Sequence, residues 1–286
     1  MERISKTVGE ALDGVGILDF LKKELGLSVT LVKRVKYGGV FINGENVHMR
    51  ATVHAGDTVE VILPEEECSE ITPINMPLDI VYEDEYIIAV NKPSGMPTHP
   101  SRGNSLPTLA EGIMGYFAPR KFVFRSVNRL DRDTSGIVLV AKDAISAARL
   151  SEEMKRGEFE KTYVAIVTGT PSPSEATIDA PIEREAADSI KRIVRADGKS
   201  AVTEYRVLRT LKNGNSLCEV RLHTGRTHQI RVHFAYVGHP LAADFLYGER
   251  APGESYKLHA TSLSFRHPIT GERITLTSRA DFENDE

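Results

Sequence analysis

Residues 128–141 read Asn-Arg-Leu-Asp-Arg-Asp-Thr-Ser-Gly-Ile-Val-Leu-Val-Ala, a charged loop that runs directly into an apolar segment. The apolar part, 137–141, has the length and composition of a buried strand. Further strand-like runs lie outward from it, at 79–82, 86–90, 162–167, 201–208 and 217–222. They outnumber the helical segments and do not alternate regularly with them. The pattern therefore predicts an α+β domain with a mixed, largely antiparallel sheet.

The first 64 residues predict a separate small unit. Apolar spacing favours a helix over 18–25, and Ser28 is placed to cap a second helix that ends at Gly38-Gly39. Two apolar runs follow, with the turn dipeptide Asn43-Gly44 after the first of them. An acidic, apolar-poor stretch then indicates a linker. We expect a domain at 1–64, a linker at 65–77 and a second domain at 78–286.

Composition excludes several classes of protein. Of 286 residues, 41% are hydrophobic and 27% charged, which is typical of a soluble globular chain with a real core. The two cysteines, Cys68 and Cys218, form no metal-binding pair motif, and no signal-peptide or membrane-span pattern occurs. No P-loop, nucleophile elbow or dinucleotide-binding motif is present. We expect a cytoplasmic protein that binds no nucleotide cofactor and does not associate with a membrane.

Asp131 is the first candidate for chemistry. Its loop holds two carboxylates, two arginines and two hydroxyls next to a rigid strand. A carboxylate in this setting can act as nucleophile or base, and a neighbouring cation favours its charged form. The alternative is a solvated turn whose charges pair with one another, which is common in surface loops.

The second candidate, residues 222–233, contains three histidines and the two arginines Arg226 and Arg231. Arginine side chains suit a carboxylate or a phosphate. The histidines His223, His228 and His233 follow one another at five-residue steps, which point successive side chains apart on a helix or a strand. We therefore expect structural histidines and no metal site.

Two weaker signals involve a tyrosine and a basic segment. Tyr163 begins an apolar run, so it is either a core residue or a platform on which a base stacks. Residues 189–199 carry four cations, including Lys191 and Arg192, around an Asp-Gly turn. This segment is either an exposed solvated loop or a phosphate contact.

The sequence resembles the RluA/RluD family of pseudouridine synthases in four blocks. Residues 128–136 resemble the family's H-R-L-D-x-x-T-S-G signature, with Asn128 in place of the histidine. The other blocks are 82–95, Lys161-x-Tyr163 and 224–233, and the ending 238–248 also fits.

The resemblance implies the isomerisation of a uridine in RNA, with Asp131 as the carboxylate that initiates it. It implies that Arg231 pairs with Asp131, that Tyr163 stacks on the uracil and that Arg129 fills the gap left by the flipped nucleotide. Lys191, Arg192 and Arg226 would hold the RNA. Such an isomerisation requires no cofactor. Large-subunit ribosomal RNA is the family's commonest target, and transfer RNA is also used.

Residues 1–64 resemble an S4 RNA-binding domain, in which Lys33, Arg34 and Lys36 would contact phosphates. Eight Lys and Arg residues balance eight Asp and Glu residues there, so the unit is not basic overall. Two other classes stay open: a catalytically silent RNA-binding assembly factor of the same fold, and a metal-dependent hydrolase built on the histidines. The default oligomeric state is a monomer.

Overall fold

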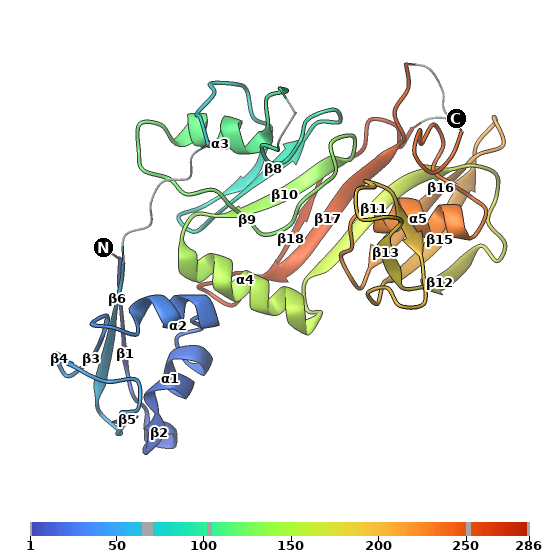
Figure 1. The fold of residues 1–286 in the computed structure, drawn as a ribbon. Coiled ribbons are helices and arrows are strands. Elements are labelled where there is room, and N and C mark those ends of the chain that lie inside the picture. Colours follow the sequence, from blue (N-terminus) through green and yellow to red (C-terminus); the bar gives the residue numbers. More distant parts are fainter. Residues whose placement is uncertain (1, 65–70, 102–104, 250–252, 285–286) are drawn as a thin grey trace.

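The computed structural model describes residues 2–64, 71–101, 105–249 and 253–284. Cys68 and residues 65–70 of the predicted linker lie outside the described residues. Figure 1 shows a small N-terminal group of strands and two helices, and a long twisted sheet that carries the remaining helices. We call residues 2–64 the N-terminal module.

The N-terminal module is built on a four-stranded antiparallel sheet in the order β1-β6-β3-β4. The strands of this sheet are β1 (Glu2–Thr7), β3 (Val40–Ile42), β4 (Glu45–Asn46) and β6 (Thr58–Leu63). The module also contains the short antiparallel pair β2 (Val15–Gly16) and β5 (Thr52–Val53). Its helices are a short 3-10 turn (Glu10–Leu12), α1 (Ile17–Lys23) and α2 (Val29–Val35).

Local sequence explains most of the module. Ser28 accepts a hydrogen bond from the Leu31 amide at 3.2 Å and so caps α2. Asn43 and Gly44 both have positive φ, as the turn between β3 and β4 requires. Strand β1 was not predicted, because Ile4 is its one apolar residue. It forms by pairing with β6 along its whole length, a contact between distant parts of the chain.

The large sheet has ten strands, eight of them in the order β12-β15-β16-β11-β17-β10-β8-β7, with β18 on β17 and β9 on β10. Among the described strands, the β10–β17 pair alone is parallel, so the predicted mixed, largely antiparallel sheet is confirmed. The strands are β7 (Ile80–Glu83), β8 (Ile87–Lys92), β9 (Arg125–Ser126), β10 (Ser135–Ala141), β11 (Glu160–Val167), β12 (Glu175–Asp179), β15 (Val202–Thr210), β16 (Ser216–Leu222), β17 (Leu258–Arg266) and β18 (Arg273–Thr277).

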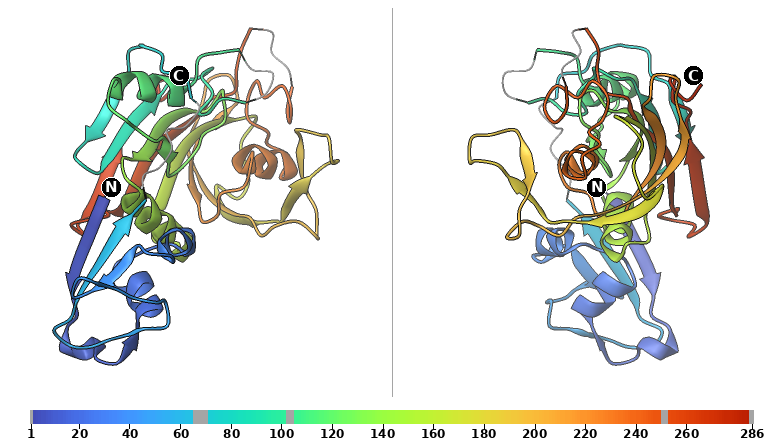
Figure 2. Two further views of the ribbon diagram at one scale, coloured as in Figure 1. Left: turned by 60° about the vertical axis from the view of Figure 1, so that its left-hand side comes forward. Right: turned by 90° about the vertical axis from the view of Figure 1, so that its right-hand side faces the viewer.

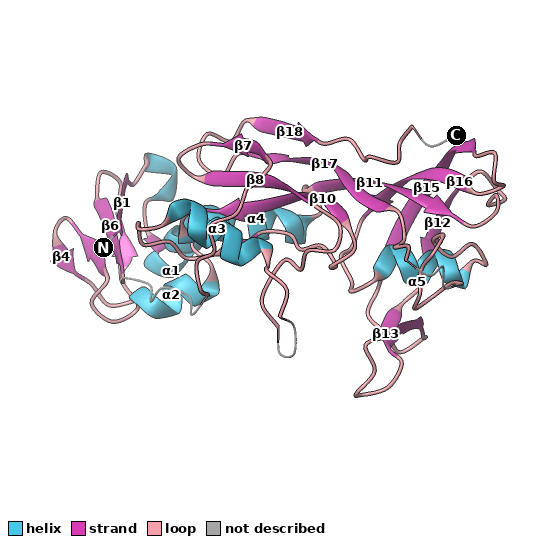
Figure 3. Cartoon of the chain, turned by 90° about the horizontal axis from the view of Figure 1, so that it is seen from above, coloured by secondary structure: helices cyan, strands magenta, loops and turns pink. Residues whose placement is uncertain are grey.

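Three helices and one hairpin complete this part. They are α3 (Leu109–Phe117), α4 (Ala144–Arg156), α5 (Gln229–Tyr236) and the hairpin of β13 (Ile182–Arg184) with β14 (Arg192–Val194). Figure 3 shows the hairpin projecting away from the sheet next to α5. Asp143 caps α4, and Gly157, which has a left-handed backbone, ends it.

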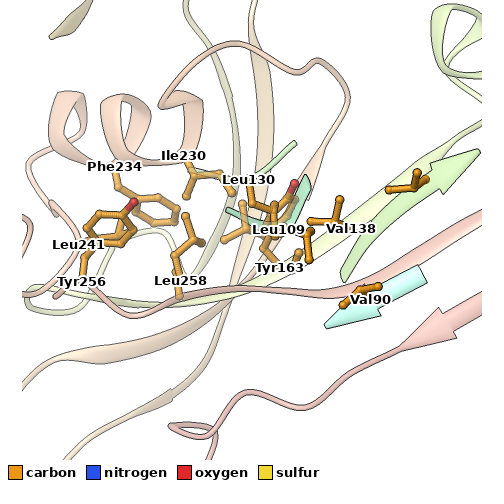
Figure 4. Packing of buried hydrophobic residues seen from close by; sticks show 14 of the residues in the cluster. Val90, Leu109, Leu130, Val138, Tyr163, Ile230, Phe234, Leu241, Tyr256 and Leu258 are labelled. Carbon is orange, nitrogen blue, oxygen red and sulfur yellow. The ribbon is translucent and has the colours of Figure 1, made fainter. Parts of the chain in front are cut away.

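The sheet packs on both faces. Along β10, Val138 and Val140 join the cluster that contains residues of α3 and α5, whereas Ile137 and Leu139 face the cluster that contains Leu150 of α4. Figure 4 shows the first cluster, where residues of α5, β11 and β17 meet. Both faces of β10 are therefore buried, which gives a rigid base to the loop that precedes it.

Helix α4 also packs against the N-terminal module. Ile145 belongs to the module's buried cluster. The Arg149 guanidinium donates to the Leu25 carbonyl in the module at 3.3 Å and to the Pro268 carbonyl at 2.7 Å. Figures 1 and 2 show α1 and α2 lying next to α4. Helix α4 therefore contributes to two cores.

The segment 71–77, predicted as linker, lies against α3. The Ile74 amide donates to the Glu111 carbonyl at 3.0 Å, and Ile71 packs against the cluster of α3. This part of the chain therefore contacts the large sheet's domain.

Candidate active site

The loop that carries Asp131 is held at both ends by side chains. Asn128 donates to the Ile137 carbonyl at 3.0 Å and accepts from the Leu139 amide at 2.8 Å. These bonds bind the start of the loop to the strand that follows it. Asparagine thus makes the bonds that hold this loop, although it is a departure from the family's histidine.

Lys92 holds the loop from the adjacent strand. Its ammonium is fully buried and donates to the carbonyls of Pro93, Met96 and Arg132, at 2.9, 2.7 and 3.0 Å. Burial lowers the pKa of Lys92 to about 8, and the nearby Asp133 and Asp131 oppose this shift. Strand β8 extends through Lys92, which pairs with Gly136, and so runs two residues beyond the strand-like segment predicted at 86–90.

Gly136 permits a close approach directly behind this loop. Its φ is +110°, and a Cβ there would lie 2.4 Å from the Ala260 carbonyl oxygen of β17. At this point β10 and β17 begin their parallel pairing, which places Ala260 opposite Gly136. Glycine is therefore required by both the backbone angle and the space.

Arg231 of α5 faces Asp131. Its Nη1 lies 3.7 Å from Asp131 Oδ2, so the predicted approach of the two groups is present in the structure. The closest partner of Arg231 is Asp244, which accepts from Nε at 2.7 Å and from Nη2 at 2.8 Å. The Asp244 carboxylate is fully buried. This two-bond pair fixes the plane of the guanidinium and leaves Nη1 directed toward Asp131.

Aromatic rings enclose the same guanidinium. The Cζ atom of Arg231 lies 4.3 Å from the Tyr256 ring centroid and 4.9 Å from that of Tyr247. Cation–π contact stabilises the charge at a site that water barely reaches. Arg231 is therefore held in one orientation by packing as well as by hydrogen bonds.

His228 is a second neighbour of Asp131. Its Nε2 lies 3.8 Å from Asp131 Oδ2, and its Nδ1 lies 2.7 Å from the Tyr247 hydroxyl. His228 has a left-handed backbone with φ of +59°, which is uncommon for a residue with a side chain and is often found at functional sites. Burial lowers the pKa of His228, while Asp131 opposes the shift, so the ring is neutral at pH 7.

Hydrogen bonding also selects the tautomer of this ring. The Tyr247 oxygen accepts from the Arg192 amide at 2.9 Å. If Tyr247 also accepted from His228, its own hydrogen would have no acceptor among the described residues. We assign the Tyr247 hydroxyl as the donor to Nδ1, which places the hydrogen of His228 on Nε2, directed toward Asp131.

Asp131 opens onto a cleft. Its side chain is 27% exposed, and Tyr163, a residue that is 6% exposed, forms part of the wall. Burial, and then the charge of Asp131, raise the pKa of Tyr163, so the phenol stays protonated. Arg129 and Arg226 line the cleft and are exposed. The structure thus brings five of the predicted site residues to one place.

The other predicted RNA contacts lie elsewhere. Lys33, Arg34 and Lys36 are exposed on or directly after α2. Lys191 and Arg192 belong to the β13–β14 hairpin, where Lys191 lies 3.8 Å from Glu185. The hairpin reaches the site through the Arg192 amide, which contacts Tyr247.

The three histidines of the second candidate segment have separate surroundings. His223 contacts Glu204 at 3.2 Å, and the buried His233 lies between the Thr203 hydroxyl and the Ala180 carbonyl. Within the described residues, no group of three or more His, Cys, Asp or Glu side chains is arranged to hold a metal ion.

Four residues of this site are not indicated by any local sequence pattern: Asp244, Tyr247, Tyr256 and Lys92. Asp244 and Tyr247 occur in the block 238–248, whose fit to the family was the available signal, but nothing local to them indicates Arg231. His228 was assigned a structural role. Its left-handed backbone, which is evident only in three dimensions, directs it to Asp131.

Comparison with known proteins shows which family the chain resembles. The sequence profile of the family described as RNA pseudouridylate synthase matches residues 86–236. An uncharacterized RNA pseudouridine synthase of Bacillus subtilis is 40% identical over 96% of this chain and 93% of its own. Ribosomal large subunit pseudouridine synthase D of Xanthomonas campestris is 37% identical over 84% of this chain and 77% of its own.

A solved structure, human RNA Pseudouridylate Synthase Domain Containing 1, matches with a TM-score of 0.61 and 26% identity. The match covers 76% of this chain and 87% of the human one. Fold, site and relatives define an RNA pseudouridine synthase, an isomerase that acts on RNA. Among these enzymes, the chain belongs to the RluA/RluD family. Within the described residues, no helix is long and apolar enough to cross a membrane.

Proposed function

We propose that Asp131 initiates the isomerisation of a uridine in large-subunit ribosomal RNA. The observation that carries this assignment is the position of Asp131 at the cleft, 3.7 Å from the fixed Arg231 and 3.8 Å from His228. A cation and a neutral donor that face one carboxylate hold it in one orientation at the cleft. Distances somewhat above hydrogen-bonding range are usual before substrate binds.

The reaction breaks the N1–C1′ bond, rotates the uracil and joins C5 to C1′, while the hydrogen on C5 is exchanged for one on N1. Asp131 begins it by attack at the sugar or by removal of a proton. The uridine must first leave its helix, because neither C1′ nor the base faces are accessible in a stack. Arg129, which is exposed beside Asp131, occupies the vacated space in the RNA.

Tyr163 stacks on the uracil as a neutral phenol. Its raised pKa makes it a poor base in the free enzyme. If Tyr163 removes the hydrogen from C5, its phenolic hydrogen must pass to an acceptor in the same step. Asp131, whose charge already influences Tyr163, is the carboxylate among the described residues that line the cleft.

RNA outside the cleft contacts two further surfaces. The β13–β14 hairpin offers Lys191 and Arg192. The N-terminal module, which we regard as S4-like, forms a groove with α4. In the lining of this groove, cationic side chains outnumber anionic ones. The cations are Lys22, Lys23, Arg34, Arg125, Arg149, Lys155 and Arg156, and the anions are Glu24 and Glu152. Such a groove attracts a phosphate backbone even though the whole chain has a net charge of −4.

Ribosomal RNA is proposed as the target because relatives with 37% and 38% identity carry the name ribosomal large subunit pseudouridine synthase D. The test uses RNA labelled with tritium at C5 of uridine, from cells that lack the protein. The wild-type enzyme should release tritium from the large-subunit fraction. Asp131→Asn, which keeps the volume and removes the charge, should release none while it binds the RNA within about threefold of the wild type.

Tritium release by Asp131→Asn would disprove the role of Asp131. Release from the transfer RNA fraction alone would disprove the ribosomal target. If the wild-type protein bound RNA and released no tritium from any fraction, the silent assembly factor would be the better description, and Asn128 would be the first residue to examine.

A further inference from the structure

Lys161 of β11 is a buried cation for which the described residues provide no hydrogen-bond or ion-pair partner. It is 8% exposed, and in the part of the chain that the structure describes no hydrogen bond or ion pair involves its ammonium. The charged side chain that acts on its pKa is Arg226, which has the same sign. Burial and then Arg226 lower the pKa of Lys161. A buried charge without a counterion is costly, so this arrangement requires an explanation.

The ammonium is not sealed into the core. Among the described residues, the fully enclosed side-chain atoms without a hydrogen-bond partner are Asn91 Oδ1 and His259 Nε2. The Lys161 ammonium, which also has no such partner, is therefore not fully enclosed. A Cβ at Gly225 would lie 3.6 Å from Lys161 Nζ. A side chain at position 225 would therefore cover the ammonium, whereas glycine leaves it open beside the loop that carries Arg226.

Arg226 is oriented for the same space. Its Nε donates to the Ser200 carbonyl at 2.8 Å, which fixes one edge of the guanidinium and leaves the others for a ligand. Arg226 also lines the cleft that contains Asp131 and Tyr163. Lys161 precedes Tyr163 by two residues on a strand, a separation of about 6.6 Å along the backbone. Lys161 and Arg226 are therefore both close to Tyr163, the residue whose ring stacks on the uracil.

We propose that Lys161 and Arg226, beside Gly225, form a binding site for a phosphodiester of RNA that flanks the target uridine. The chemistry fits: a compact ammonium and a planar guanidinium together match the charge and the several oxygens of a phosphate. The ligand would supply the counterion that Lys161 lacks. The identity of the phosphate as part of the substrate rests on the function proposed above.

The experiment compares Lys161→Met with Lys161→Arg, each combined with Asp131→Asn so that binding is measured without turnover. The probe is protein-free large-subunit ribosomal RNA from cells that lack the protein. Lys161→Met should weaken binding about tenfold, the loss expected for one charge-assisted hydrogen bond. The slope of log K against log salt should become less steep by about one, and Lys161→Arg should restore most of both. Lys121→Met, which removes an exposed lysine, is the control and should change neither.

The melting temperature separates this role from a structural one. Because methionine keeps the apolar stem and removes an unpaired buried charge, Lys161→Met should melt at the same temperature as the parent or higher. A lower melting temperature with unchanged RNA affinity would make Lys161 a structural residue and overturn the proposal. So would unchanged affinity and slope at any melting temperature.

Free phosphate is the other source of the same chemistry. Inorganic phosphate alone should raise the melting temperature less in Lys161→Met than in the parent. If that difference appears while RNA affinity stays unchanged, the site holds a free anion and the RNA assignment is wrong. These binding results do not depend on tritium release, so failure of the proposed catalysis and failure of the phosphate site are distinguishable.

Discussion

Arg231 and Asp244 form a buried ion pair with two hydrogen bonds, of 2.7 and 2.8 Å, that leaves a third nitrogen of Arg231 3.7 Å from Asp131. Asp244 therefore does not compete with Asp131 for the arginine. It determines which edge of the guanidinium Asp131 meets, and two tyrosine rings prevent the side chain from turning away.

Replacing Asp244 should damage both stability and turnover. Asp244→Asn removes the negative charge that pairs with the buried Arg231 guanidinium. Breaking a buried ion pair costs about 3–5 kcal/mol. We expect a fall of about 3 kcal/mol in the free energy of unfolding, because asparagine keeps one acceptor, and a drop in kcat of more than about tenfold. Urea denaturation and tritium release measure the two effects. The control is Glu204→Gln, which removes an exposed partner of His223 and should change stability by less than about 0.5 kcal/mol.

Tyr247→Phe should lower kcat without weakening RNA binding. The change removes the hydroxyl that donates to His228 Nδ1, so the ring no longer has a fixed hydrogen on Nε2. We expect kcat to fall about tenfold and the affinity of the Asp131→Asn form to change less than about twofold. Tyr236→Phe, on an exposed tyrosine, is the matched control. An unchanged kcat would mean that His228 does not position Asp131.

Lys92→Met should loosen the catalytic loop. The substitution leaves the carbonyls of Pro93, Met96 and Arg132 without their shared donor, and each unsatisfied buried group costs about 1–3 kcal/mol. We expect a loss of at least about 2 kcal/mol in unfolding free energy and faster amide hydrogen exchange in residues 130–134. Lys155→Met, at an exposed lysine, serves for comparison. Unchanged exchange in the loop would contradict this role.

His233 should make the protein sensitive to acid. Burial lowers the pKa of His233 from its ordinary 6.5, so the unfolded chain binds a proton more readily than the folded one. Stability therefore rises with pH in this range and decreases as pH falls below about 6.5. His228 and His259, whose pKa values burial also lowers, act in the same direction. Melting temperatures between pH 5 and 8 should show a shallower slope for His233→Gln than for the wild type, and an equal slope would refute the assignment.

Removing Lys33 and Arg34 together tests the N-terminal module as an RNA contact. The double alanine variant should bind RNA more weakly. If both residues contact phosphates, the slope of log K against log salt should become less steep by about two. The comparison variant is Lys6→Ala, whose lysine pairs with Glu24 in the same module. A salt slope equal to that of the wild type would show that these residues do not touch RNA.

The parts predicted well from sequence are those determined within a short stretch of chain. The loop of Asp131, the strand after it and the helix α2 capped by Ser28 each depend on neighbours in sequence, and the structure has them where the patterns indicated. Strand β1 and the extension of β8 depend on partners far along the chain, so local composition did not indicate them. The approach of Arg231 to Asp131 followed from family resemblance and not from spacing. Asp244, Tyr247 and Lys92 join the site only through tertiary contacts, which no local pattern encodes.

Helix α4 has a consequence for engineering chimeras. Ile145 fills the core of the N-terminal module although it lies about eighty residues beyond the last strand of that module. A hybrid enzyme that exchanged residues 1–64 with those of a relative would set a foreign surface against Ala144, Ile145 and Ala148. Transplantation of RNA specificity between relatives would therefore require a graft in two pieces, the module together with the first turns of α4.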